Sequence, residues 1–129
     1  MSESTVRFPD QCNVADYFLF DRLAEGLGAK VALRFGDRAW TYQQVADQAR
    51  NLAQFFVADG LRPEDRVAII LPDVPPFVWG IFGTVAAAGI LAMGNPATPT
   101  ADLAYMLGYV KAAVVITTPE VAGALAETG

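Results

Sequence analysis

The sequence contains no histidine and only one cysteine, and these two shortages exclude several classes of protein. Without histidine, the chain cannot build a Ser-His or Cys-His nucleophile system from its own residues. Zinc and non-haem iron sites lose their most common ligand for the same reason. Cys12 has no partner for an internal disulfide, so we expect a reducing, cytoplasmic setting in which Cys12 is an ordinary thiol rather than a nucleophile.

Basic residues are also scarce, with 9 Lys and Arg against 14 Asp and Glu, which gives a formal net charge of −5. This balance argues against a nucleic-acid backbone or an anionic membrane surface as partner. Residues 1–12 carry acidic side chains and no apolar stretch, so we predict a short N-terminal extension rather than a signal peptide. The length of 129 residues corresponds to one domain, and 53% of the residues are hydrophobic, enough for a core.

The block "PPFVWGIFGTVAAAGILAMGNP" carries no charge at all and is nearly long enough for a membrane helix. Its leading proline pair suits the first turn of a helix, and Gly89 suits the C′ position, which would end that helix after about 13 residues. The remaining "ILAM" would then form a short strand. Acidic rather than basic residues, Asp73 and Asp102, flank the block. We therefore predict a buried helix and a core strand, with a membrane span as the weaker alternative.

Periodicity predicts an alternation of strands and helices along the rest of the chain. Asn13 is expected to cap a first helix, a hairpin turns at Gly36, and Thr41 with Gln44 forms a capping box for a helix over 41–59. The runs "RVAIIL" and "AAVVIT", each closed by a proline, are typical of strands buried on both faces of a parallel sheet. Thr100 is expected to cap the helix between them. We predict an α/β fold with an N-terminal hairpin and helix followed by βαβ units of a parallel sheet.

These segments have a familiar order. The stretch from "RAWTYQQVADQARNLAQFF" through "GLRPEDRVAIILPDVPP" and "AAAGILAMGNP" to "KAAVVIT" closely resembles the N-terminal part of adenylate-forming acyl-CoA ligases. In that family, a "(W/L)TYxxL" helix start precedes "GLxPGDRVAI", an apolar helix ending in "AAGA", and a strand leading to "NP". The upstream "NVADYFLFDRLAEGLGAKVALRF" is most similar to the benzoate- and anthranilate-CoA ligases. The resemblance spans about residues 13–125 and implies that the predicted sheet is part of the large N-terminal domain of an adenylating enzyme.

The resemblance also implies a two-step reaction and its cofactors. In this family a carboxylate, here an aryl carboxylic acid, attacks the α-phosphate of ATP to give an acyl-adenylate and pyrophosphate, and the coenzyme A thiol then displaces AMP. The required parts are a glycine-rich phosphate loop with a lysine, a carboxylate that supports Mg²⁺, and a lysine from a small mobile domain.

None of those parts is found in this sequence. There is no "(S/T)SG(S/T)TGxPK" loop, and "GLGAK" lacks the glycine spacing and follows a helix rather than a strand. Residues 13–129 are therefore interpreted as an incomplete N-terminal subdomain, a truncation or proteolytic product with no catalytic residue of its own. Alone, it is predicted to be inactive and to bind none of ATP, Mg²⁺ and coenzyme A. Its main partner would be the remainder of the ligase chain, and a bare sheet edge would permit self-association.

One loop is a candidate binding segment. In several relatives the residue after "NP" is an arginine that approaches the phosphates of coenzyme A, whereas this chain has Ala97. Contacts with coenzyme A would then come from the backbone or from Thr98 and Thr100. The alternative is a plain strand-to-helix connector that ends in a helix cap.

A second interpretation of the whole chain is a free-standing binding domain of flavodoxin-like design. Such a domain would be monodisperse and would melt cooperatively, whereas an incomplete subdomain would expose apolar faces or strand edges and associate.

Overall fold

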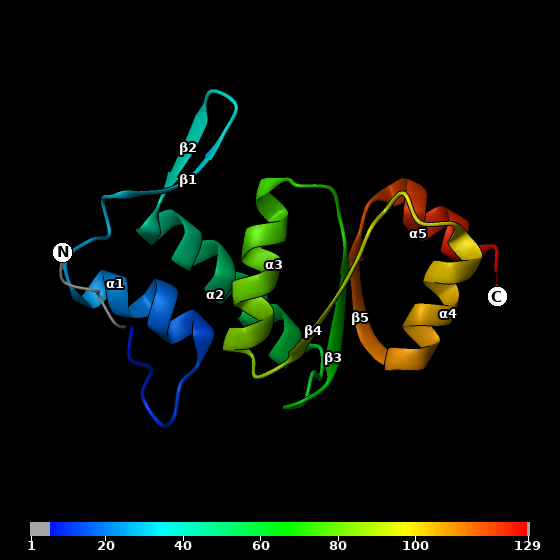
Figure 1. The fold of residues 1–129 in the computed structure, drawn as a ribbon, viewed down its shortest axis with the longest axis horizontal. Coiled ribbons are helices and arrows are strands. Elements are labelled where there is room, and N and C mark those ends of the chain that lie inside the picture. The colour runs from blue at the N-terminus through cyan, green and yellow to red at the C-terminus, as the bar shows by residue number, and fades with distance from the viewer. Residues whose placement is uncertain (1–5, 129) are drawn as a thin grey trace.

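The computed structural model describes residues 6–128, so residues 1–5 of the predicted extension and Gly129 lie outside the described part. A parallel sheet forms the middle layer, with α2 (Tyr42–Ala58) and α3 (Pro75–Ala86) on one face and α4 (Thr100–Val110) and α5 (Pro119–Ala126) on the other (Figure 1). Neighbouring residues of the central strand point to opposite layers: the side chain of Ile69 lies against α3, and that of Ile70 points toward α4. The predicted α/β class is confirmed.

The sheet has the order β4-β3-β5, in which β3 (Arg66–Ile70) pairs in parallel with β4 (Ile90–Gly94) and with β5 (Ala112–Thr117). Four of the five β3 residues are buried, as the apolar run predicted. The expectation that β5 is buried on both faces is wrong: its first four residues alternate between half-buried and exposed, and Val115 is 37% exposed. Because β5 pairs with β3 along one side alone, fewer neighbours cover it than cover the central strand.

The helix α2 begins with the capping box that the sequence predicted. The Gln44 N–H donates to Thr41 Oγ1 over 3.2 Å, and the Thr41 N–H donates to Gln44 Oε1 over 2.9 Å. This helix packs closely on α3, where a Cβ on Gly83 would lie 3.0 Å from Leu52 Cβ and 3.1 Å from the Ala49 carbonyl. The small residue at position 83 therefore sets the distance between the two helices.

The charge-free block forms α3, a turn and β4. As predicted, α3 starts at the proline pair, and it is 12 residues long. Gly89 was expected at C′, but Ala88 takes the left-handed conformation there, with φ of 62°. Gly89 comes one residue later, where its N–H donates to the Thr84 carbonyl over 2.9 Å and an added Cβ would lie 3.3 Å from the Asp65 carbonyl. Close backbone approach, and not φ, requires glycine at position 89. Within residues 6–128, no helix has both the length and the apolar character needed to cross a membrane.

The N-terminal part packs beside these layers. Asn13 caps the first helix, as predicted, by accepting the Ala15 N–H over 2.8 Å, and its Nδ2 donates to the Val85 carbonyl at the end of α3 over 2.9 Å. The sequence did not predict that this helix contains a π-helical segment, η1 (Asp16–Phe20), before α1 (Asp21–Ala24). The predicted hairpin is formed by β1 (Val31–Phe35) and β2 (Arg38–Thr41), and it projects beyond α2 (Figure 1).

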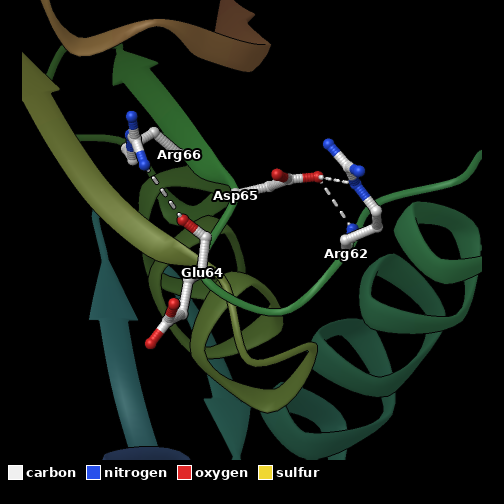
Figure 2. Close-up of polar contacts among 4 residues, drawn as sticks. All are labelled: Arg62, Glu64, Asp65 and Arg66. Atoms are coloured by element: carbon white, nitrogen blue, oxygen red, sulfur yellow. Dashed lines mark hydrogen bonds and ion pairs between the residues drawn. The ribbon is translucent and has the colours of Figure 1, made fainter.

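A hydrogen-bonded turn stands at the amino end of β3, where Figure 2 shows Arg62, Glu64, Asp65 and Arg66. Asp65 Oδ2 accepts the Arg62 backbone N–H over 2.8 Å and lies 3.7 Å from Arg62 Nε. Arg66 Nε donates over 2.8 Å to the carbonyl of Val110, the last residue of α4. Since the α4 carbonyl end carries partial negative charge, the guanidinium is well placed to attach that helix to the strand.

The start of α4 differs from the prediction that Thr100 is its cap. Pro99 occupies the N-cap position, Thr100 is the first helical residue, and no side chain caps the helix. The proline ring at position 99 restricts φ, which is −52° here, and so favours the start of the helix. No hydroxyl group accepts a hydrogen bond from the first turn. At α5, by contrast, Thr118 caps with its side chain, accepting the Val121 N–H over 3.3 Å.

Candidate functional site

The carboxyl ends of the three parallel strands lie along one edge of the sheet, at Ile70, Gly94 and Thr117. The Thr117 hydroxyl donates to the Ile70 carbonyl over 2.8 Å and joins two of these ends. From this edge, α3 and α4 leave toward opposite faces of the sheet (Figure 1). In open α/β sheets, the divergence of two such connections creates the crevice in which ligands bind.

A cleft of about 480 Å³ occupies this position. It lies between the loop that leads from β3 into α3 and the end of β4, and its lining residues are Leu71, Pro72, Asp73, Phe77, Met93, Gly94, Asn95 and Pro96. Most of these side chains are apolar, with one carboxylate and one amide among them. Such a composition suits a ligand that combines apolar surface with a few polar groups.

Gly94 determines how closely β4 approaches α4 at this edge. A Cβ on Gly94 would lie 3.1 Å from Met106 Cε, 3.4 Å from Ile70 Cγ1 and 3.5 Å from Leu103 Cδ2. The end of β4 is therefore packed against the buried side of α4, and the chain that follows emerges beside the cleft.

The loop after β4 contains the residues that the sequence proposed for binding. Asn95 Oδ1 accepts the Ala97 N–H over 2.8 Å, and the Asn95 carbonyl accepts the Thr98 N–H over 3.0 Å. Ala97 is exposed, while Thr98 and Thr100 are half-buried, and none of the three lines the cleft. Because the amides at positions 97 and 98 are used within the loop, contacts with a ligand there would come from side chains.

Three of the residues that line the cleft, Asp73, Phe77 and Asn95, were not predicted as site residues from the sequence. A signal for two of them was present, since Asp73 and Asn95 come shortly after the apolar runs that form β3 and β4. Polar residues at the carboxyl ends of adjacent parallel strands meet at one edge and are natural ligand contacts.

Among the described residues, no three His, Cys, Asp or Glu side chains lie close enough together to hold a metal ion. Asp73 is the one carboxylate of the cleft, which does not make a Mg²⁺ site, and no glycine-rich loop is present for the phosphates of ATP.

Comparison with known proteins gives consistent matches. A family model described as AMP-binding enzyme matches residues 20–128. A long-chain-fatty-acid–CoA ligase of Bacillus subtilis (strain 168) is 30% identical over 117 residues, which are 91% of this chain and 18% of that protein. A benzoate CoA ligase from Burkholderia xenovorans LB400 has a TM-score of 0.82 at 25% identity, over 91% of this chain and 24% of its own.

The anthranilate CoA ligase AuaEII, solved with anthranoyl-AMP, has a TM-score of 0.84 over 93% of this chain and 23% of its own, and at 24% identity this likeness shows a shared fold. The chain thus spans less than a quarter of the length of each of these proteins.

Proposed function

The chain belongs to the AMP-binding enzyme family, and from that premise we propose that it supplies the N-terminal part of an ATP-dependent carboxylate–CoA ligase. The observation that carries the proposal is the family match over residues 20–128, together with a parallel sheet that has a ligand-sized cleft at its carboxyl edge. The same match favours a ligase over the free-standing flavodoxin-like domain. The chain covers 18% of the fatty-acid ligase that it matches, which agrees with a role as one part of a longer protein.

The proposed reaction of the parent protein has two steps. A carboxylate oxygen attacks the α-phosphorus of ATP and releases pyrophosphate, and the sulfur of coenzyme A then attacks the acyl carbon and releases AMP. We propose an aryl carboxylic acid as substrate, supported by the structural likeness to a benzoate CoA ligase. The residues that bind ATP and Mg²⁺ would come from the remainder of the ligase chain, since the carboxyl edge does not fit either group.

This chain would contribute scaffold and one side of a binding site. The cleft with Asp73 and Asn95, and the adjoining loop with Ala97, Thr98 and Thr100, would face coenzyme A. Exposed apolar residues of the sheet such as Ile90 and Val115 would be covered by the rest of the ligase chain, and in its absence they would promote self-association. The exposed free thiol of Cys12 agrees with a reducing cytoplasm.

The test uses the full-length protein that contains this chain. Exchange of pyrophosphate into ATP is measured with benzoate, anthranilate and decanoate, and thioester formation is measured after coenzyme A is added. We expect exchange that depends on an aryl acid, followed by thioester formation. Absence of acid-dependent exchange would refute the ligase, and equal exchange with decanoate would refute the aryl substrate.

The 129-residue chain alone provides the matched control. It should show no exchange with any acid at equal molar concentration, because it lacks the phosphate loop. Exchange by the isolated chain would contradict its assignment as a non-catalytic part.

A further inference from the structure

Two tyrosines of α4, Tyr105 and Tyr109, are unusually exposed. Their exposed fractions are 74% and 77%, the two highest among the exposed large hydrophobic side chains of residues 6–128. The two rings stack on each other, with centroids 6.2 Å apart and an interplanar angle of 24°. Because each ring restricts the other, the pair presents an ordered aromatic surface, and burying it against a partner would cost little conformational entropy.

The rest of the exposed side of α4 is poor in charge. Its exposed residues are Ala101, Asp102, Tyr105, Gly108 and Tyr109, and only one of these is charged. The helix α2 provides a comparison within the same chain, since every exposed residue from 43 to 51 is polar or charged. A helix side that faces only water is normally polar, as in α2. The exposed side of α4 has instead the low charge and the tyrosines that are typical of the core of a contact between proteins.

The position of α4 in the fold leaves this side open to a partner. Together α4 and α5 form an outer layer, and the sheet separates them from α2 and α3 (Figure 1). Leu103 and Met106 face the end of β4, where they lie 3.5 and 3.1 Å from a Cβ added to Gly94. Tyr105 comes two residues after Leu103 and so lies on the opposite side of the helix. The sheet therefore covers one side of α4, and the tyrosines lie on the outer surface of the layer.

The charges at the two ends of α4 identify a second copy of the chain as a fitting partner. Asp102 is exposed in the first turn, and Lys111 is exposed at the C-cap. Within residues 6–128, neither side chain makes a hydrogen bond or an ion pair. A two-fold axis halfway between these positions relates two antiparallel copies of α4 and places Asp102 of each copy opposite Lys111 of the other.

The same axis also suits the aromatic residues and the helix dipoles. It lies midway between Tyr105 and Gly108, so the Tyr105 ring of each copy meets the other helix where no side chain projects. Beyond its chain neighbours and the backbone of its own helix, Gly108 has no atom within 4 Å of an added Cβ, so the space there is open. In an antiparallel pair, the positive start of each helix lies near the negative end of the other. One arrangement therefore satisfies charge, shape and helix direction.

We propose that the protein forms a symmetric homodimer through α4, with Tyr105 and Tyr109 at the centre of the interface and the Asp102–Lys111 ion pairs at its rim. This dimer goes beyond the proposed ligase function and does not depend on it. It uses the outer side of a helix, whereas association of an incomplete subdomain would use the strand edges of the sheet.

The first experiment measures the dimer dissociation constant of the full-length protein by sedimentation velocity over a concentration series. Wild-type protein should associate to a dimer. Tyr105→Ala should raise the dissociation constant roughly a hundredfold, because a loss of about tenfold at a central tyrosine occurs in both copies. Asn51→Ala, at an exposed polar site on α2, is the matched control and should stay within about twofold of wild type.

Exchange of the charges tests the antiparallel arrangement. Asp102→Lys and Lys111→Asp each replace both ion pairs with like charges, and each should weaken the homodimer about tenfold. An equimolar mixture of the two single variants restores opposite charges at both positions, as does the double variant, so both should dimerise within about threefold of wild type. Aspartate suits position 111, where φ is 52°, because it adopts this left-handed conformation more readily than most residues.

Three results would overturn the proposal. These are a wild-type protein that remains monomeric throughout the series, a dimer that Tyr105→Ala does not weaken, and charge variants that do not recover in the mixture or in the double variant. Far-UV circular dichroism of Tyr105→Ala should match wild type, which shows that loss of the dimer is not loss of the fold. Because the charge variants keep both tyrosines, they test the dimer even if Tyr105→Ala unfolds.

Discussion

The amino and carboxyl edges of the parallel sheet, where its strands begin and end, differ in how their connecting segments are hydrogen-bonded. At the amino edge, neighbouring connections bind one another: the Ile90 N–H donates to the Asp65 carbonyl over 2.9 Å, the Glu64 N–H donates to the Ala88 carbonyl over 2.8 Å, and Arg66 binds the last residue of α4. At the carboxyl edge, the loop after β4 bonds mainly to itself and leaves a cleft beside it. The amino edge therefore holds neighbouring strands and helices together, whereas the carboxyl edge leaves a cleft. Substitutions of the residues that make these bonds at the amino edge should therefore cost stability, and those of the exposed residues that line the cleft should not.

The largest effect is expected for Gly89→Ala at the amino edge. The added Cβ would lie 3.2 Å from the Thr84 carbonyl and 3.3 Å from the Asp65 carbonyl, and backbone atoms cannot move aside cheaply. We expect a loss of about 2–3 kcal/mol in the free energy of unfolding, measured by urea denaturation.

Gly108→Ala on α4 is the matched control for Gly89→Ala. Beyond its chain neighbours and the backbone of its own helix, no atom lies within 4 Å of its added Cβ, so it should stabilise the helix by about 0.5–1 kcal/mol. Equal urea midpoints for the two variants would mean that the close backbone approach at Gly89 does not matter for stability.

The next effect is expected for Arg66→Met, which removes the charged donor to the Val110 carbonyl and keeps an apolar stem of similar length. We expect a loss of about 1.5–2 kcal/mol in the free energy of unfolding. Arg62→Met is the control, because the Arg62 side chain is 83% exposed and its ion pair with Asp65 is 3.7 Å long. That variant should change stability by less than about 0.5 kcal/mol. If the two substitutions lower the free energy of unfolding equally, the bond from Arg66 to α4 stabilises the protein no more than the exposed ion pair of Arg62 does.

Thr84→Val would remove a buried polar atom near the amino edge that has no hydrogen-bond partner among the described residues. Thr84 is completely buried, and its hydroxyl has no hydrogen-bond partner among the described residues. Valine has the same shape without the polar atom, so we expect a gain of about 1 kcal/mol in unfolding free energy. Thr84→Ser keeps the hydroxyl and removes a methyl group, and should lose about 1 kcal/mol. A higher thermal midpoint for serine than for valine would contradict this account.

The smallest effect is expected for Asp73→Ala at the carboxyl edge. Asp73 is exposed and makes no side-chain hydrogen bond or ion pair within residues 6–128, so its removal should change stability by less than about 0.5 kcal/mol. Asp65→Ala at the amino edge removes the acceptor of the Arg62 N–H and should cost about 1 kcal/mol. Paired urea titrations compare the two, and the reverse order would mean that the carboxyl edge also stabilises the fold.

Features encoded by neighbouring residues were predicted well from the sequence. The capping box of Thr41 and Gln44 and the order of strands and helices depend on local spacing and on apolar runs. Features decided by distant contacts were missed by one position or more. Gly89 is needed because the Asp65 carbonyl lies close to it, and no local pattern shows that approach.

The site was harder to predict than the fold for a related reason. The family resemblance directed attention to Ala97, Thr98 and Thr100, whereas the cleft is lined by Asp73 and Asn95. These two residues belong to different loops, and they line one cleft because parallel pairing aligns the ends of β3 and β4. The sequence places each of them shortly after an apolar run, but the pairing of β3 with β4 is needed to show that the two runs are neighbours.

The central place of β3 has a consequence for how the chain is made. Ile70, at the end of β3, and Thr117, which binds its carbonyl, are 47 positions apart in the sequence. A ribosome adding about 5–20 residues per second needs roughly 2–9 seconds to cover that interval. Throughout it, β3, the most buried strand of the sheet, has at least one open edge, the arrangement that invites pairing with a foreign strand. The nascent chain is thus most vulnerable to aggregation between the emergence of β3 and that of β5. Faster synthesis of this segment, or a chaperone that covers β3 during it, would improve the yield of folded protein.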